Sequence, residues 1–381
     1  MSNLGFLWLS AIPVLPWLII KFGDMPLLYA VGGLVLIIAI YIVIQRLLGS
    51  LEIGGLDKRA VFITGCDTGF GHLLALKCLG RGMPVFAGCL TKEGAQALRK
   101  RAEVLPGKLD TIIVDVANDE SVKQAAVYLE KATEKYGGLH GVVNNAGIVG
   151  ATFFDDMLTA KDYKNVAEVN TFGVIRVTQA TKHLVKKTRG RIVTVASICA
   201  RVGLMGVGPY TVSKYAVSGY CEVIRQELRY FGVSVHILEP GFFKTPLIDE
   251  KIVQARLDEV WKTVPDRVKE EYGEQFFHDS RKRATEMLSS FGSSRVDLVV
   301  DAYFHALTAR FPHLRYQVGT DSKFFFVPLS YFPTGFRDAL FSAADKLFSA
   351  PVPEKAIETY AKGNKKAFTK INIEGNGKAA M

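Results

Sequence analysis

Six short apolar runs, separated by stretches of helical periodicity, restrict the fold of this chain more than any other feature of its sequence. The runs are residues 60–64, 85–89, 111–114, 141–143, 191–195 and 234–238. Continuous apolar runs of this length are typical of strands buried on both faces, and strands that alternate with helices form a parallel sheet covered by those helices. The sequence therefore predicts an α/β fold with a doubly wound parallel sheet.

The first 48 residues differ from the rest and predict a membrane anchor. Two segments, 4–20 and 26–45, contain no charged residue. The second is long enough to cross the hydrocarbon core of a bilayer, which takes about 20 residues. The first is shorter and contains Pro13 and Pro16, so a second span, an interfacial helix and a signal-like region remain alternatives for it. The first ten residues carry no basic side chain, which favours a retained anchor over a cleaved signal peptide.

Charged residues on either side of the second segment favour a cytosolic catalytic domain. Arg46, Lys58 and Arg59 follow the segment, whereas Lys21 and the nearby Asp24 precede it. Positive charge collects on the cytosolic side of membrane spans, so the side with more basic residues is expected to face the cytosol.

Composition excludes several classes of protein. With 381 residues and 49% hydrophobic content, the chain can bury one large or two ordinary cores. The five cysteines are odd in number and lack CxxC spacing, so we expect buried, reduced thiols rather than disulfides or a metal site. The net charge of +10 comes from scattered Lys and Arg, so no nucleic-acid partner is expected. A surface that faces anionic lipid and an ordinary solvated surface both remain open.

The predicted layout places a single Rossmann-type catalytic domain between the anchor and a C-terminal extension. The segments are an anchor at 1–48, a linker at 49–57, the domain at 58–320 with a charged, helical, substrate-covering insertion at 246–294, an apolar extension at 321–361 and a disordered tail at 362–381. Within the extension, residues 324–341 are apolar but broken by prolines, a glycine and two charges. This stretch is too interrupted to span a bilayer, and we expect it to dip into the membrane or to pack on the core near the active site.

A glycine-rich loop follows the first predicted strand and opens a predicted helix. Residues 64–71 read TGCDTGFG. Glycines at such a junction allow a tight turn and let a pyrophosphate approach the free amides of the helix N-terminus. The loop therefore predicts a dinucleotide site.

The end of the second predicted strand, residues 85–92, bears on the choice of nucleotide. An acidic side chain there is usual for NAD and an arginine for NADP, and the segment VFAGCLTK has neither. Lys92 could meet a 2′-phosphate, whereas Asp67 in the glycine loop would repel one. We expect NAD rather than NADP.

Ser197, Tyr210 and Lys214 form the pattern that predicts the chemistry. Tyr210 and Lys214 lie four residues apart, on one face of a helix that begins near Pro209. A nearby ammonium is expected to lower the pKa of the phenol, and a tyrosine base beside a nicotinamide is a complete arrangement for alcohol oxidation. Ser197, at a strand end, can bind the substrate oxygen. The segments Asp115-Val116 and 144–147 (NNAG) end two further strands along the same crevice.

Together these motifs resemble the short-chain dehydrogenase/reductase family over residues 58–352. Within it, the chain is similar to the retinol dehydrogenase and 17β-hydroxysteroid (3α-hydroxysteroid-oxidising) dehydrogenase branch. The similarity lies in the amino-acid sequences of four segments: residues 64–71, 240–245 (PGFFKT), 305–308 (HALT) and 323–334 (KFFFVPLSYFPT). The N-terminus departs from many relatives because two apolar segments, rather than one, precede the domain.

The resemblance implies a role for each site residue. Asn170 would hold a water in a proton relay, Ser197 would position substrate, Tyr210 would be the acid/base, and Lys214 would bind ribose and tune the tyrosine. The implied cofactor-binding set is Thr64, Gly65, Gly69, Phe70, Gly71, Asp115, Asn144, Tyr210, Lys214, Pro240, Gly241 and Thr245. In that set the glycines hold the pyrophosphate, Asp115 the adenine, Asn144 the adjacent ribose and residues 240–245 the nicotinamide end.

The resemblance also implies a lipophilic substrate, a retinoid or steroid, and anchoring in the endoplasmic reticulum membrane in contact with its lipid. A homodimer is possible. Two alternatives stay open. The first is a mitochondrial membrane enzyme that acts on 3-hydroxybutyrate, since that branch shares the sequence VFAGCL of residues 85–90. The sequence shows no dedicated group of residues to bind the carboxylate of such a substrate. A non-catalytic nucleotide-binding membrane scaffold is the other, and the presence of both Tyr210 and Lys214 argues against it.

Overall fold

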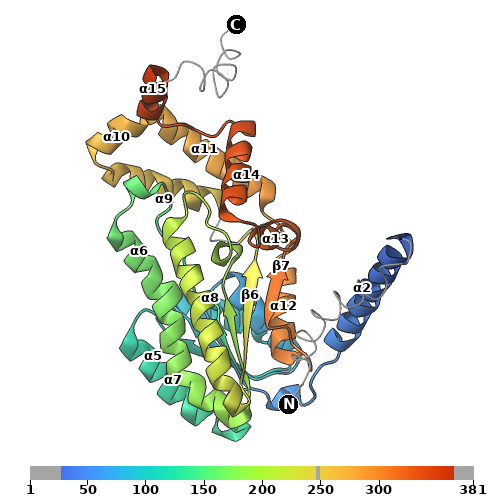
Figure 1. The fold of residues 1–381 in the computed structure, drawn as a ribbon. Helices are drawn as coiled ribbons and strands as arrows, with labels where there is room; N and C mark the ends of the chain where they lie inside the picture. Colours follow the sequence, from blue (N-terminus) through green and yellow to red (C-terminus); the bar gives the residue numbers. More distant parts are fainter. Residues whose placement is uncertain (1–26, 246–248, 364–381) are drawn as a thin grey trace.

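The computed structural model describes residues 27–245 and 249–363 of the chain (Figure 1). A seven-stranded sheet with the order β3-β2-β1-β4-β5-β6-β7 forms its centre, and every neighbouring pair is parallel. The strands are β1 (Val61–Thr64), β2 (Val85–Cys89), β3 (Leu109–Ile113), β4 (Gly141–Asn144), β5 (Arg191–Val195), β6 (Ser234–Pro240) and β7 (Arg315–Val318). The predicted doubly wound parallel sheet is confirmed.

All six predicted strands are present, with ends shifted by up to two residues, and one strand was missed. β7 has four residues whose side chains alternate between half-buried and buried, so it lacks the continuous apolar run by which the other strands were found. It lies at the edge of the sheet, where one side of the strand has no neighbour.

Helices cover both faces of the sheet, and successive side chains of the strands face opposite helical layers. Val61 and Ile63 of β1 pack against one layer, whereas Phe62 packs against the other. The first layer contains α3 (Gly69–Gly80), α4 (Lys92–Ala102) and α12 (Asp297–Thr308). The second contains α5 (Asp119–Ala132), α7 (Gly173–Thr188) and α8 (Gly208–Leu228). All five cysteines are free and buried, as expected.

The segment after β6 is helical and has an aromatic core of its own. Its helices are α9 (Glu250–Thr263), α10 (Asp266–Tyr272) and α11 (Glu274–Phe291). Trp261 and Phe277 stack at a centroid distance of 4.7 Å, and Phe153 packs against both. Figure 1 shows α9 and α11 beyond the carboxyl ends of the strands. The helices therefore lie at the end of the sheet where doubly wound folds bind ligands.

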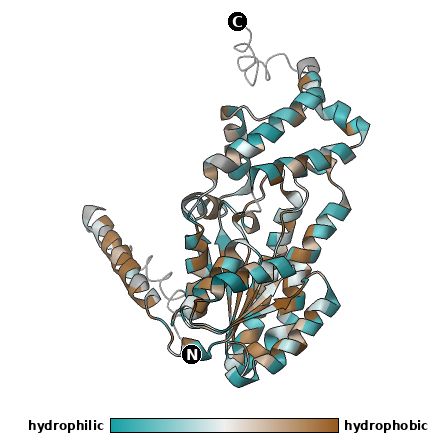
Figure 2. Cartoon of the chain, turned by 180° about the vertical axis from the view of Figure 1, so that it is seen from behind, coloured by the Kyte–Doolittle hydropathy of each residue, from teal (hydrophilic) through white to brown (hydrophobic). Residues whose placement is uncertain are grey.

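The N-terminal helix α2 (Leu27–Gly49) stands apart from the domain and is apolar over most of its length (Figure 2). Its segment Val31–Gly49 has a mean hydropathy of 2.3 and none of it is buried, so by length and composition it can cross a membrane. The predicted segment 26–45 is thus helical from residue 27 onward. The predicted first segment, 4–20, and the tail beyond residue 363 lie outside the described residues.

Candidate active site

The glycine-rich loop connects β1 to α3 in a conformation that only glycine adopts readily. Gly65 and Gly69 have φ angles of +71° and +64°, in the left-handed region. A Cβ on Gly71 would overlap the side-chain amide of Asn145 and the carbonyl of Gly65. The loop is therefore closed tightly against the turn that follows β4.

Asn145 holds this loop in place and was missed among the site residues predicted from the sequence. Its Nδ2 donates to the carbonyls of Thr64 and Gly65, at 3.0 and 3.1 Å, and its Oδ1 accepts from Tyr303 Oη at 3.1 Å. Thr64 Oγ1 in turn accepts from the amides of Asn145 and Ala146. Thr64 is fully buried, so its side chain ties β1 to β4. The position of Asn145 in the motif NNAG was the available signal.

The N-terminus of α3 leaves room for an anion. Its N-cap, Thr68, makes no side-chain capping bond, and a Cβ on Gly69 would meet nothing within 4 Å. Free amides and open space at a helix N-terminus suit a phosphate. The residues present thus fit the pyrophosphate of a dinucleotide.

Asp67 joins the glycine loop to the end of β2. Its carboxylate accepts from the backbone amides of Leu90 and Thr91, at 2.8 and 2.9 Å, and from the Thr91 hydroxyl at 2.8 Å. The end of β2 is where a dinucleotide fold meets the adenosine ribose. NAD-binding folds usually carry an acidic residue at the end of β2, and this chain has none there. The carboxylate of Asp67, from the glycine loop, places a negative charge at that position instead.

Two residues predicted to contact the adenosine half lie in different surroundings. Asp115 is exposed just beyond the end of β3, and its Oδ1 accepts from the Ala117 amide at 2.9 Å. Asn144 is buried, and its Nδ2 donates to the hydroxyls of Thr178 and Thr194 at 2.9 and 3.3 Å. The Asn144 side chain thus points into the core, and any contact that this residue makes with a ribose must come from its backbone.

Ser197, Tyr210 and Lys214 meet where β5 ends and α8 begins. Ser197 caps the 3-10 turn η5 (Ile198–Ala200), and its Oγ accepts from the Cys199 amide at 3.1 Å. Lys214 Nζ lies 5.4 Å from the centroid of the Tyr210 ring and donates to the Val195 carbonyl at 3.0 Å. One helix and one strand end therefore bring together the three residues predicted to carry the chemistry.

Burial controls the titration of this pair, and the predicted lowering of the tyrosine pKa by Lys214 is wrong for the chain by itself. Burial raises the pKa of Tyr210, and a hydrogen bond with Ser197 only partly opposes the rise. Burial also lowers the pKa of Lys214 to about 8. An ammonium that is itself destabilised by desolvation offsets little of the cost of burying a phenolate.

Asn170 lies in a π-helical turn, η4 (Glu168–Phe172), between α6 (Ala160–Ala167) and α7. Its buried side chain accepts from the Ile148 amide and donates to the Ile148 carbonyl, both at 2.8 Å, and donates to Ser213 Oγ at 3.0 Å. A Cβ on Gly147 would lie 3.1 Å from Asn170 Oδ1 and 3.8 Å from Lys214 Nζ. Asn170 and Lys214 are thus close to the same point of the turn after β4.

The loop at residues 240–245 is fixed by Asp321, which was also missed. Asp321 Oδ2 accepts from the Phe242 amide at 2.7 Å, and its carboxylate fills the space where a Cβ on Gly241 would stand. Phe243 packs edge-on against Phe70 of the glycine loop at a centroid distance of 6.1 Å. Pro240 is buried at the end of β6, and Thr245, half-buried, ends the described part of the loop. Asp321 follows the unpredicted strand β7, so no pattern in the sequence pointed to it.

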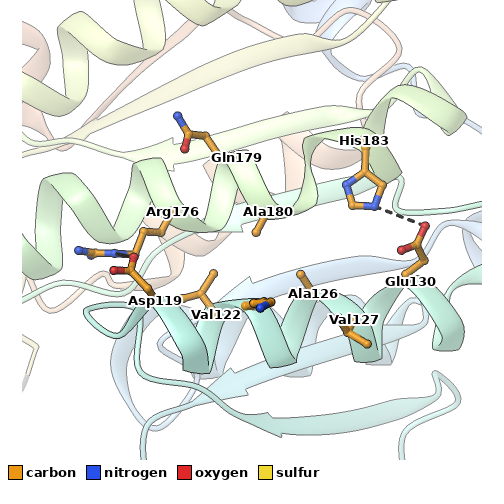
Figure 3. A pocket seen from close by; sticks show the side chains of 10 residues that line it. Asp119, Val122, Ala126, Val127, Glu130, Arg176, Gln179, Ala180 and His183 are labelled. Carbon is orange, nitrogen blue, oxygen red and sulfur yellow. Dashed lines mark hydrogen bonds and ion pairs between the residues drawn. The ribbon is translucent and has the colours of Figure 1, made fainter.

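A groove of about 420 Å³ lies elsewhere, between α5 and α7 (Figure 3). Charged side chains rim it, including His183 and Glu130, whose Nε2 and Oε1 are 3.6 Å apart. It shares no residue with the predicted site.

Comparison with known proteins places the chain in a family. The sequence pattern described as short chain dehydrogenase matches residues 59–255. The chain is 40% identical to 17-beta-hydroxysteroid dehydrogenase type 6 of Rattus norvegicus over 308 residues, which cover 81% of this chain and 95% of the relative. It is 43% identical to retinol dehydrogenase 7 of the same organism over 285 residues, 75% of this chain and 88% of that protein.

Solved structures agree on the fold. A short-chain dehydrogenase from Streptomyces avermitilis superposes with a TM-score of 0.56 at 20% identity, covering 80% of this chain and 98% of the other. One from Burkholderia phymatum in complex with NAD has a TM-score of 0.53 at 21% identity, covering 79% and 98%. The chain therefore belongs to the short-chain dehydrogenase/reductase family, in the branch that contains these 17-beta-hydroxysteroid and retinol dehydrogenases.

Proposed function

We propose that the chain is a membrane-anchored, NAD-dependent dehydrogenase that interconverts an alcohol and its ketone or aldehyde on a lipophilic substrate, a hydroxysteroid or a retinol. The observation that carries the proposal is the convergence of Tyr210, Lys214 and Ser197 at the carboxyl ends of the strands, beside a loop that fits a dinucleotide. The named relatives supply the substrate class.

Tyr210 acts as the acid/base. In oxidation its phenolate takes the proton of the substrate hydroxyl, and Ser197 binds the same oxygen and keeps the carbinol carbon in place. When bound, NAD supplies the acceptor for the hydride that leaves that carbon. In reduction Tyr210 returns the proton.

Lys214 performs two tasks in this scheme. Its ammonium, held by the Val195 carbonyl, would donate to the ribose of the bound cofactor. The nearby Asn170, fixed by both polar groups of Ile148, would hold a water that takes a proton from Lys214 in oxidation and returns one in reduction. In oxidation the proton taken up by Tyr210 would thus leave to solvent by way of Lys214 and this water.

The choice of NAD is supported by Asp67. A 2′-phosphate at the end of β2 would stand near a carboxylate that three hydrogen bonds hold in place. Two like charges about 4 Å apart repel by roughly 4 kcal/mol at an effective dielectric constant of about 20. A ribose 2′-hydroxyl can instead donate a hydrogen bond to the carboxylate.

The membrane supplies the substrate. Helix α2 is the proposed anchor, and basic residues after it favour a domain on the cytosolic face, which we place at the endoplasmic reticulum. Retinols and steroids partition into bilayers, so an anchored enzyme works at a high local concentration of substrate.

A substrate panel tests this function. The full chain, purified in detergent, is given NAD with all-trans-retinol, 3α- and 3β-hydroxysteroids, 17β-hydroxysteroids and 3-hydroxybutyrate, and NADH fluorescence is followed. We expect turnover of at least one steroid or retinol. Turnover of 3-hydroxybutyrate alone would refute the proposal of a lipophilic substrate. No turnover of any compound in the panel, with intact NADH binding, would favour a nucleotide-binding scaffold.

A further inference from the structure

The segment that follows β7 presents large aromatic side chains to solvent. It comprises the π-helical turn η8 (Ser322–Phe326), α13 (Val327–Leu329) and the start of α14 (Thr334–Leu347). The aromatic residues, which we call the aromatic face, are Phe324 (78% exposed), Phe325 (46%), Tyr331 (75%), Phe332 (49%) and Phe336 (51%). Single exposed apolar residues are ordinary, but five within thirteen positions form a patch that a soluble surface rarely leaves open.

The aromatic face rests on a fixed base. Val327 and Leu329 are buried, and Phe326 packs against Phe242 of the 240–245 loop at a centroid distance of 6.0 Å. Phe332 and Phe336 stack on each other at 4.8 Å. The segment is therefore tied to the 240–245 loop, where the nicotinamide end of the cofactor is expected, while its aromatic face stays exposed.

The charge pattern suits a lipid surface. Residues 324–336 contain no charged side chain, and the first charges on either side are the cations Lys323 and Arg337, the latter followed by Asp338. Burying the aromatic face in a bilayer would desolvate no charge, while the two flanking cations would meet anionic headgroups. Aromatic residues with a basic border are typical of the membrane–water interface.

Position along the chain joins this face to the anchor. The residues just after α2 are bonded to the residues just before β7: Ile53 N donates to the Thr308 carbonyl at 2.8 Å, and Arg310 N donates to the Leu51 carbonyl at 2.6 Å. His305 Nε2 bonds to the carbonyl of Gly49, the last residue of α2, at 2.9 Å. Figure 1 shows β7 and α12 on the side of the domain from which α2 projects.

β7 itself spans the distance between anchor and aromatic face. The anchor is attached before its amino end, the aromatic face begins after its carboxyl end, and a strand of four residues is about 13 Å long. Both features therefore lie along one edge of the sheet.

We propose that the aromatic face docks on the surface of the bilayer that α2 crosses, as a second membrane contact beside the active site. This inference rests on the proposed function for the anchor and deepens it by naming the lipid surface as the partner of residues 324–336. Two contacts fix the orientation of the domain and bring the 240–245 loop to the interface, where a lipophilic alcohol can enter without crossing water.

Site-directed fluorescence tests the docking. Because the native cysteines are at most 5% exposed, Phe324→Cys and Phe332→Cys can each be labelled selectively with an environment-sensitive dye. Val104→Cys is the matched control, since Val104 is 91% exposed and adjoins β3 at the opposite edge of the sheet. The full chain is reconstituted in vesicles of phosphatidylcholine and phosphatidylserine, and NADH binding confirms that each variant is folded.

Brominated phosphatidylcholine is expected to quench the dyes at residues 324 and 332 but not the dye at residue 104. Aqueous iodide is expected to quench the dye at residue 104 but not those at residues 324 and 332. Equal iodide quenching at all three sites would overturn the proposal. Protection from iodide without quenching by brominated lipid would also overturn it, because a protein contact would then cover the face. The fluorescence measurement does not depend on turnover. If the chain oxidised none of the alcohols, the proposed function would be refuted, but the docking of the aromatic face could still be measured.

A kinetic variant supplies an independent readout. Phe324→Ser combined with Phe332→Ser is expected to raise the KM for a substrate delivered from vesicles by about tenfold, equivalent to about 1.4 kcal/mol. The kcat and the KM for NAD should not change, and Val104→Ser should behave as wild type. An unchanged KM for the vesicle-borne substrate would contradict a role of the face in substrate entry.

Discussion

At the scale of single residues, the chemistry depends on groups whose charges are held where water is excluded. Burial raises the pKa of Tyr210 and lowers that of Lys214 to about 8, so near pH 7 the tyrosine is a neutral phenol while the lysine still carries most of its charge. Activation of the tyrosine therefore requires a further positive charge next to the phenol hydroxyl.

Asp67→Asn tests how the chain selects its cofactor. The amide retains an oxygen that can accept from Thr91 but removes the negative charge at the end of β2. We expect the ratio of kcat/KM for NADP to that for NAD to rise by about tenfold, or about 1.4 kcal/mol. Steady-state kinetics with both cofactors measure it, and Asp115→Asn, which alters a charge beyond β3, is the comparison. An unchanged ratio would mean that Asp67 does not select against the 2′-phosphate.

His140 should make the fold sensitive to acid. Its Nε2 donates to the Leu307 carbonyl and its Nδ1 accepts from Arg59, so the ring is neutral, and burial lowers its pKa from 6.5 to about 4. Between those pH values the unfolded chain binds more protons, so the free energy of unfolding falls as the pH falls. The loss from this residue is about 2 kcal/mol at pH 5.

Thermal unfolding of the detergent-solubilised chain at pH 7 and pH 5 measures this effect. His140→Gln, whose amide can still donate to Leu307, should show a smaller drop in Tm between the two pH values than wild type does. The same drop in both proteins would assign the acid sensitivity to other groups, such as the buried His236.

At the scale of elements, the close packing of the glycine loop against the turn after β4 determines the shape of the cofactor site. Tyr303 from α12 reaches Asn145, which in turn binds two carbonyls of the loop. Three elements far apart in sequence therefore fix one short loop. A periodicity argument identifies each element but not the contact among them.

Gly71→Ala and Gly219→Ala form a matched pair for testing this packing. At Gly71 the new methyl group would overlap Asn145 and Gly65, so we expect a loss of stability of about 2 kcal/mol and NAD binding weakened by at least about tenfold. At Gly219, on the exposed side of α8, nothing lies within 4 Å, and alanine should stabilise the helix by about 0.5–1 kcal/mol. Thermal unfolding and NADH titration report both. Normal cofactor affinity in Gly71→Ala would show that the loop is looser than described.

The same contrast explains what could be predicted from the sequence. The strands could be predicted because each is a local apolar run, and the spacing of Ser197, Tyr210 and Lys214 is likewise a local pattern. The structure brings these three residues together, and their catalytic roles stay a prediction. β7 was missed because its side chains are only half apolar, and Asp321 was missed with it. The side chain of Asn144 was expected at the ribose, but it faces Thr178 and Thr194 in the core. Successive side chains of a strand point to opposite faces of the sheet, and the motif alone does not tell which of them points into the core.

At the scale of the whole molecule, one apolar helix and one catalytic domain share an edge. The segment after α2 is hydrogen-bonded to the end of α12, so no free linker joins α2 to the domain. If α2 crosses the bilayer as proposed, the domain can meet the membrane surface in few orientations. The proposed docking of the aromatic face belongs to the same arrangement.

Ile40→Arg tests the anchor. Ile40 is exposed near the middle of the apolar segment Val31–Gly49, where an arginine costs about 3 kcal/mol to insert. We expect a marked fall in the fraction of the chain that resists alkaline carbonate extraction from membranes. Ile252→Arg, on the exposed face of α9, is the control and should leave extraction unchanged. Full resistance in Ile40→Arg would show that α2 is not what anchors the chain.

The most direct test of the central claim, that Tyr210 is the acid/base of an alcohol dehydrogenase, compares turnover and cofactor binding in Tyr210→Phe. On the alcohol that the wild-type chain oxidises, the variant should lose kcat by about a thousandfold, because a positioned acid/base contributes about a hundred- to ten-thousandfold. NADH titration should show affinity within about threefold of wild type, since the ring and the neighbouring Lys214 remain. Turnover retained in Tyr210→Phe, with cofactor binding intact, would contradict the account.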